Sequence, residues 1–323
     1  MKANISRVGS MALVVAVMTA CGGGGGGGSP SAVVDPVLVV PGGNIGTVST
    51  CSGTSNATGL RALSDLDRVR FGYGLAQWLA ARLPTVYNDS NADFYPVAAV
   101  ANVVSCAGGG SANYQWLDND RDGKKSVRDQ FTVGYQQCVR GETSLDGQET
   151  LTLLANGDYE LQSAWTDGDN QLNATLRATQ QSVGSYTFSM VDTGFAPTGG
   201  SLRYDGMDLE LKNLRVDTDE DATTNQWSLD FDLFVYNAGT NVLDSGMSFG
   251  PKSTPAGKQF QGPIGGNPTT GNMNVLALFD VFRSVDLRVA ADPAYVLIVV
   301  DPSLMLAGDE STTQLSWQDF LNQ

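Results

Sequence analysis

Acidic side chains at alternate positions of one short segment have the best spacing for binding chemistry in this chain. Asp118, Asp120 and Asp122 occupy positions 1, 3 and 5 of a loop, and Gly123 follows at position 6. Asp129 falls at position 12 of the same loop. Alternate side chains converge on one centre, glycine allows a sharp turn, and hard carboxylate oxygens are ligands that suit calcium. The spacing therefore predicts a calcium site.

The segment resembles the calcium loop of an EF-hand. Lys124 stands at position 7, where such loops use the backbone carbonyl, and Ser126 stands at position 9. The aspartate at position 12 is shorter than the usual glutamate, Arg121, Lys124 and Lys125 bring positive charge, and the flanking segments are predicted strands. The alternative interpretation is an acidic, solvated hairpin tip that holds no metal.

The chain contains no histidine among its 323 residues. This excludes Ser-His-Asp and Cys-His catalysis, histidine bases and metal sites with imidazole ligands. The segment 246–250 matches the G-x-S-x-G pattern, but that motif needs a histidine and a strand-to-helix turn, and Pro251 follows it. We therefore expect a non-enzyme. A glycan hydrolase that uses two carboxylates stays open as an alternative, because it needs no histidine.

The N-terminus has the pattern of an export signal. Lys2 and Arg7 precede an apolar run of 13 residues, 8–20, which is too short to span a bilayer because that takes roughly 20. Small residues, Thr19 and Ala20, come directly before Cys21. This arrangement resembles the lipobox of bacterial lipoproteins, which implies cleavage after residue 20 and acylation, including palmitate, of Cys21. The alternative is an ordinary secreted protein cut after Ala20.

A glycine run follows the predicted lipidation site. Gly22–Gly28 open a segment, 21–50, that we interpret as a flexible tether. Its expected reach from residue 22 to about residue 48 is roughly 25–30 Å. The residue after Cys21 is glycine and not the aspartate that retains lipoproteins at the inner membrane. The resemblance therefore implies the bacterial outer membrane, with the body either periplasmic or surface-exposed.

The predicted mature chain is strongly acidic. Removing residues 1–20 takes two of the 19 basic residues and none of the 34 acidic ones, which leaves a formal net charge of −17. Such a charge argues against nucleic acid and anionic headgroups as partners. The expected partners are the membrane, reached through the lipid anchor, and an unidentified envelope protein or glycan.

Three cysteines remain besides Cys21. An exported protein meets an oxidising compartment, so one disulfide is expected. We predict Cys106–Cys138, because both cysteines lie at the ends of strand-like segments flanking one loop. Cys51 would then be free or paired with another chain. The alternative is that Cys51 is the partner and one of the other two is a buried thiol.

One amphipathic helix is predicted over 64–83. Ser64 can cap it together with Asp67, apolar residues follow at steps of three and four, and Pro84 is expected to end it. From about residue 95 onward the pattern is β. We predict a mainly β fold, an antiparallel meander that forms a curved or partly closed sheet with the N-terminal helix packed on it. The expected organisation is one domain over 51–323.

Several segments carry the β prediction. Residues 227–236 alternate with period two, and Phe234 and Tyr236 make the second face apolar, where the helix is expected to pack. The segment 294–300 is predicted as a strand buried on both faces, and turns are predicted at 156–157, 167–168 and 205–206. We expect 250–271 to be a surface loop or a break between subdomains and 217–221 to be a charged loop. The tryptophans at 116, 165, 227 and 317 are expected in the core.

As a whole the sequence resembles β-rich outer-membrane lipoproteins of proteobacteria that carry a polyglycine tether and a D-x-D-x-D-G hairpin before a later cysteine. The resemblance implies lipidation of Cys21 and carries over no activity. We therefore expect a non-catalytic binding or structural module of the envelope. The alternative to this, besides the hydrolase, is a carrier or chaperone whose curved sheet and helix 64–83 enclose an acyl ligand.

Overall fold

The computed structural model describes residues 59–90, 103–141, 143–190, 199–251, 259–280, 283–301 and 310–322. The predicted signal peptide (1–20), Cys21, the tether (21–50) and Cys51 lie outside these residues. The predictions made for them therefore stay predictions.

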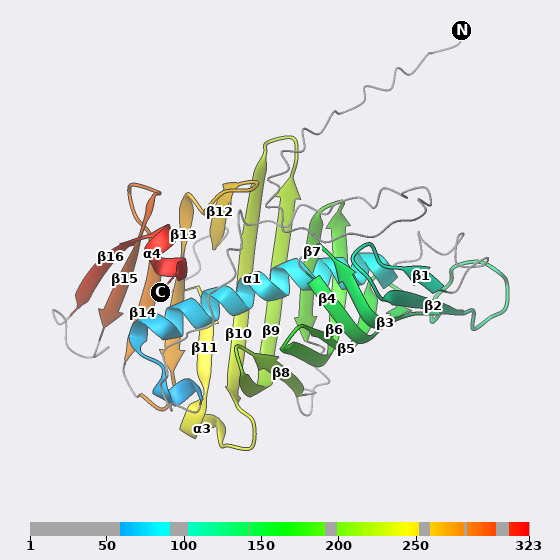
Figure 1. Cartoon of the computed structure of the whole chain (residues 1–323), viewed down its shortest axis with the longest axis horizontal. Coiled ribbons are helices and arrows are strands. Elements are labelled where there is room, and N and C mark those ends of the chain that lie inside the picture. The colour runs from blue at the N-terminus through cyan, green and yellow to red at the C-terminus, as the bar shows by residue number, and fades with distance from the viewer. Residues whose placement is uncertain are drawn as a thin grey trace, which may run out of the picture. The chain divides into compact units, whose positions relative to one another are not determined.

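Within these ranges sixteen strands form one antiparallel sheet, which confirms the predicted meander (Figure 1). Most strands pair with the next strand along the chain, so the sheet is built from successive hairpins. The strands are β1 (Val103–Ser105), β2 (Ser111–Leu117), β3 (Gln130–Arg140), β4 (Thr143–Leu153), β5 (Tyr159–Asp167), β6 (Asn170–Ser182), β7 (Ser185–Met190), β8 (Gly200–Tyr204), β9 (Met207–Asp221), β10 (Gln226–Asn237), β11 (Met247–Gly250), β12 (Phe260–Pro263), β13 (Thr270–Ala277), β14 (Ser284–Val289), β15 (Tyr295–Asp301) and β16 (Ser311–Ser316).

Two of the strand positions are interrupted. β7 and β8 both pair with β6 and β9, and β11 and β12 both pair with β10 and β13. Met190 of β7 lies opposite Leu176 of β6, and Ser201 of β8 lies opposite Asn173 of β6. Between these two pairs β6 has two residues, whereas the chain from β7 to β8 has ten. Each pair of short strands thus occupies one strand position of the sheet, one after the other.

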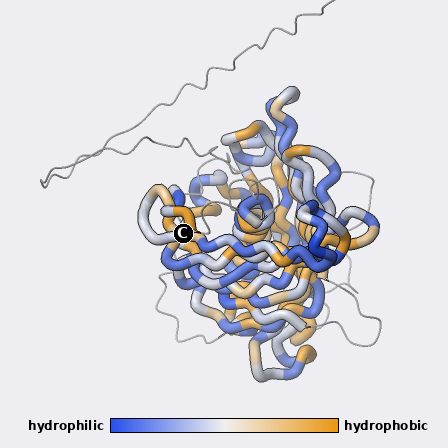
Figure 2. The backbone as a smooth tube through the Cα atoms, turned by 90° about the vertical axis from the view of Figure 1, so that its right-hand side faces the viewer, coloured by the Kyte–Doolittle hydropathy of each residue, from blue (hydrophilic) through white to orange (hydrophobic). Residues whose placement is uncertain are grey.

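The helix α1 (Asp65–Ser90) crosses the strands on the inner face of the sheet (Figure 1). Near its start Phe71 contacts Phe249 of β11, in its middle Trp78 contacts Trp165 of β5, and near its end Tyr87 contacts rings of β5 and β7. A single helix reaches strands this far apart because its 26 residues extend about 39 Å, which is roughly eight strand spacings. Figure 2 gives the view along this helix. The predicted helix-on-sheet packing is confirmed.

The start of α1 follows the prediction, and its end does not. The Ser64 hydroxyl accepts a hydrogen bond from the Asp67 backbone N–H (3.2 Å), which caps the helix, and donates one to the Asp67 carboxylate (2.6 Å). The prediction that Pro84 ends the helix is wrong, because the helix continues to Ser90. Val86 and Tyr87 beyond the proline are fully buried, and this burial outweighs the missing N–H.

The predicted turns are confirmed. Asn156-Gly157 lies in the connection between β4 and β5, and the β5–β6 turn follows Asp167 with Gly168. Asp205 and Gly206 form the two-residue turn between β8 and β9, with φ of 50° and 74°. Positive φ at both central positions is the type I′ geometry that suits the twist of a hairpin.

Other expectations are corrected by the sheet. The stretch 250–271 holds β12 and the start of β13, so it is neither a simple loop nor a break. Residues 217–221 belong to β9 and are not a loop. Trp116 is 37% exposed, whereas the other three tryptophans predicted in the core are buried. The helix α1 contacts β10, while Phe234 of that strand lies beside Gly246, which follows the short helix α3 (Val242–Ser245).

The core lies between α1 and the inner face of the sheet. Val296 and Ile298 of β15 belong to it, and Val300 on the same face packs against it. On the second face of that strand Val299 is buried, Leu297 is half-buried and Tyr295 is exposed, so the predicted burial on both faces is only partly met. Two short helices complete the described chain, η1 (Leu60–Ala62) and α4 (Trp317–Asn322). None of the helices in the described ranges is long and apolar enough to cross a membrane.

Candidate functional site

The predicted calcium loop is the tip of the β2–β3 hairpin. Residues 118–129 connect the end of β2 to the start of β3, and Trp116 pairs with Phe131 at their base. At the other end of the hairpin the disulfide Cys106–Cys138 joins the two sides, with 5.3 Å between the Cα atoms. The predicted pairing of these cysteines is confirmed. The loop 118–129 thus lies at one end of the hairpin, and the disulfide holds the other end.

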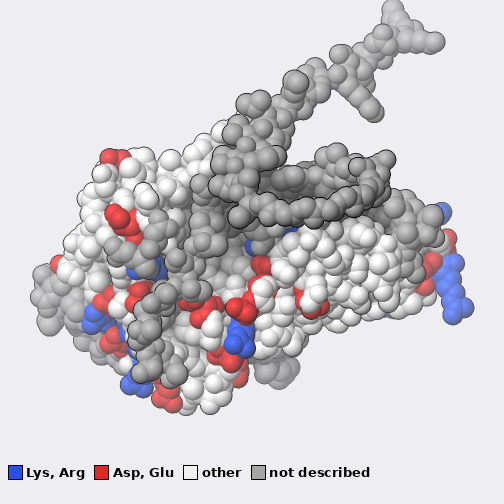
Figure 3. Space-filling view, in the orientation of Figure 1, with Lys and Arg blue, Asp and Glu red and all other residues white. Residues whose placement is uncertain are grey.

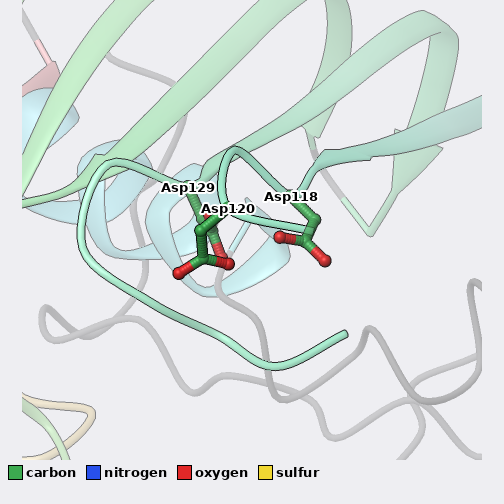
Figure 4. A group of neighbouring side chains, drawn as sticks. All are labelled: Asp118, Asp120 and Asp129. Carbon is green, nitrogen blue, oxygen red and sulfur yellow. The ribbon is translucent and has the colours of Figure 1, made fainter. Parts of the chain in front are cut away.

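Three of the predicted carboxylates converge at this tip. Oxygen atoms of Asp118, Asp120 and Asp129 all lie within 4.8 Å of one another (Figure 4). Asp129 is buried, Asp118 is half-buried and Asp120 is exposed. Positions 1, 3 and 12 of the loop are thereby brought to one side, as a cation held by hard oxygen ligands requires.

Backbone N–H groups hold two of these side chains in place. Asp118 accepts hydrogen bonds from the N–H of Arg121 (2.6 Å) and of Gly123 (2.8 Å). Asp129 accepts from the N–H of Asn119 (3.0 Å) and of Ser126 (2.9 Å). The loop is therefore shaped by its own carboxylates, and these bonds also satisfy part of the negative charge.

Asp120 is the most accessible of the three carboxylates. Its Oδ2 accepts a hydrogen bond from the Ser126 hydroxyl (2.9 Å), and its Oδ1 accepts one from the Asp122 N–H (3.2 Å). The Ser126 bond is the main cause that lowers the pKa of Asp120, while the nearby Asp129 charge raises it. Asp120 is thus held in its charged, ligand-competent form.

Of the other two predicted members, Asp122 stands apart from this group. Asp122 does not belong to the converging set, and its Oδ1 accepts from the Lys124 N–H at 2.7 Å. Lys124 is exposed, as are Arg121 and Lys125. Lys and Arg side chains are visible at the end of the molecule where this hairpin projects (Figure 3). Positive charge in the loop therefore offsets part of the charge of the three carboxylates.

A second polar group, which the sequence analysis missed, lies beneath the C-terminal half of α1. Glu149 of β4 is fully buried, and its Oε2 accepts a hydrogen bond from Trp165 Nε1 (2.9 Å). Burial raises the pKa of Glu149 to about 8. A signal was present in the sequence, since Glu149 shares the strand parity of Leu145 and Leu151, both of which are fully buried.

An ion pair fixes the end of α1 beside this glutamate. Asp89 pairs with Arg140 of β3 and accepts a hydrogen bond from the Tyr135 hydroxyl (3.1 Å). Arg140 also donates to the Tyr114 hydroxyl of β2 (3.3 Å). Burial, followed by the Asp89 and Glu149 charges, raises the pKa of Tyr135 well above its usual value. These groups tie α1 to β2 and β3.

Comparisons with known proteins add no family to this picture. No protein-family model, curated protein or solved structure matches the chain. The resemblance to proteobacterial lipoproteins therefore stays a prediction from the sequence.

Proposed function

We propose that this chain is an outer-membrane lipoprotein, anchored by acyl chains on Cys21, with a non-catalytic body that binds or supports another envelope component. The N-terminal signal pattern, the cysteine after Ala20 and the glycine run support the anchor. A multiply acylated cysteine is expected to hold the protein stably, since stable anchoring takes more than one chain.

The observation that favours a binding or supporting body over a carrier is how the hollow of the curved sheet is filled. Tyr73, Leu75, Leu79 and Leu83 of α1 are fully buried there against the inner face of the sheet. A carrier of acyl ligands would need an apolar cavity in this place. The chain's own helix takes that space along the described residues, which favours a supporting or binding module over a carrier.

The serine of the G-x-S-x-G pattern supports the same interpretation. Ser248 lies within β11, between β10 and β13, and pairs with Phe234 and Leu276. A nucleophile elbow instead places its serine at a strand-to-helix turn. We accordingly assign no catalytic role to this serine.

The anchor is tested by the mass and location of the exported protein. We expect the native protein to fractionate with outer membranes and to carry the mass of its acyl chains on an N-terminal Cys21. The Cys21→Ala variant should lose both properties. An unmodified thiol on the native protein, or a freely soluble native protein, would overturn the proposal.

A calcium ion at the hairpin tip is the second part of the proposal. It is supported by the convergence of Asp118, Asp120 and Asp129. Calorimetric titration of the native protein with calcium should show binding with a dissociation constant of about 0.1–1 mM, the range of extracellular modules.

The loop itself provides a matched control for this titration. Asp120→Asn should abolish the binding heat, whereas Asp122→Asn should retain it, because Asp122 lies outside the converging group. Each variant removes one negative charge from an exposed position of the same loop. No heat with the native protein, or equal loss in the two variants, would rule out the site as assigned.

A further inference from the structure

Glu149 occupies an environment in which one of its oxygen atoms lacks a partner. Its side chain points from β4 to the inner face of the sheet, directly across from Ser163 of β5. Trp165 Nε1 donates to Oε2, but neither Oε1 nor the Ser163 hydroxyl completes a hydrogen bond. Both of these atoms are buried. The carboxyl group therefore has one indole N–H bound to it, and beside it lies one buried hydroxyl that can either donate or accept.

A neutral carboxylic acid fits this site better than a carboxylate does. The carbonyl oxygen of the acid accepts from Trp165, and its O–H can donate to Ser163. A carboxylate would receive only bonds from neutral groups in a place without water, where the loss of hydration dominates. Burial outweighs the lowering effects of Ser163 and Trp165 on the pKa of Glu149.

The charged and titratable groups around Glu149 offer no spare cation. Tyr135 faces it from β3, with Tyr114 of β2 behind. On the side of α1, Asp89 is already paired with Arg140, and Arg82 is already paired with Asp167 of β5. Within the described residues, ionised Glu149 would therefore add a buried negative charge with no counter-ion assigned to it.

The indole that binds Glu149 also supports the helix. Trp165 contacts the ring of Trp78 of α1, with 5.5 Å between the ring centroids. Trp78 Nε1 in turn donates to Asp167 (3.4 Å), the carboxylate that also binds Arg82. Because Trp165 contacts both Glu149 and Trp78, an opening that brings water to a charged Glu149 disturbs this contact between α1 and β5.

We propose that Glu149 is a proton-operated latch, which keeps the C-terminal half of α1 packed on β3–β5 while protonated and releases it when ionised. Release exposes Glu149 to water, where its carboxyl group is fully charged above its ordinary pKa. One proton is therefore lost on opening, and the opening equilibrium constant rises about tenfold per pH unit between pH 5 and 7. The rise levels off above pH 8, where Glu149 is ionised in both states.

Amide hydrogen exchange of the full-length protein tests this latch. After correction for the intrinsic pH dependence of exchange, α1, β4 and β5 of the native protein should lose protection from pH 5 to pH 8. Glu149→Gln should keep its protection over this range, because the amide bonds both Trp165 and Ser163 without titrating. Glu160→Gln on the opposite face of β5 is the matched control and should behave as the native protein does.

A direct readout of the carboxyl group keeps the test independent of how well the variants fold. The infrared carbonyl band of a protonated acid should be present in the native protein at pH 6 and absent from Glu149→Gln. It should fade as the pH rises through about 8. Two results would overturn the proposal: an ionised Glu149 at pH 6, or the same loss of protection in native protein and Glu149→Gln.

Discussion

Removing the disulfide should weaken the fold by an amount that can be worked out from its position. Cys106 and Cys138 are 32 residues apart in the sequence, and both are buried. On the chain-entropy model, opening a loop of this size stabilises the unfolded state by about 4 kcal/mol. For a domain of this size the melting temperature should fall by about 8–16 °C.

Urea unfolding of three proteins measures this effect. The double variant Cys106→Ala, Cys138→Ala should unfold at lower urea than the native protein, and Cys51→Ala, which leaves the disulfide intact, should match the native protein. Reducing agent should lower the urea midpoint of the native protein to near that of the double variant, and it should leave the midpoint of the double variant unchanged. A difference below about 1 kcal/mol, or a reducing-agent effect that disappears in Cys51→Ala, would contradict the reasoning.

Three further changes test how α1 sits on the sheet. Gly72→Ala should destabilise the protein by about 1–3 kcal/mol in urea unfolding, because the added Cβ would come within 2.1 Å of the buried Phe249 ring. Unchanged stability would show that the ring moves aside without cost. Pro84→Ala should stabilise it by about 1–2 kcal/mol by restoring a bond to the Ala80 carbonyl, and a lower midpoint would mean that the proline ring packs better than alanine. Native stability relative to Glu149→Gln should fall by about 4 kcal/mol from pH 5 to pH 9, because the folded state holds a proton that the unfolded state has released; a constant difference would contradict the raised pKa.

Local signals in the sequence identified many of the strands and turns. The alternation at 227–236 gave β10, the Asn156-Gly157 pair marked a hairpin, and Ser64 with Asp67 marked the start of α1. These features depend on residues within a few positions of one another. The same is true of the carboxylates in the loop 118–129, which converge in part as expected.

Features that depend on distant partners were not predictable in this way. The helix passes Pro84 because Tyr87 packs on Tyr159 and Tyr186, and no local pattern reveals those contacts. The ion pair of Asp65 with Arg283 joins residues that are 218 positions apart. Glu149 shows the opposite case, since its parity with Leu145 and Leu151 was readable in the sequence, but its indole partner Trp165 lies on another strand.

The two interrupted strand positions have a consequence for how the chain can be altered. Ten residues lie between Met190 and Ser201, whereas β6 has two residues between the partners of these two. Ten residues also lie between Phe249 and Phe260, whereas β10 has three between the partners of these two. The chain therefore has eight and seven more residues at these two places than the neighbouring strand has. The register of β7, β8, β11 and β12 is set by their pairing with β6, β9, β10 and β13, so a change in the length of either stretch should leave that register in place.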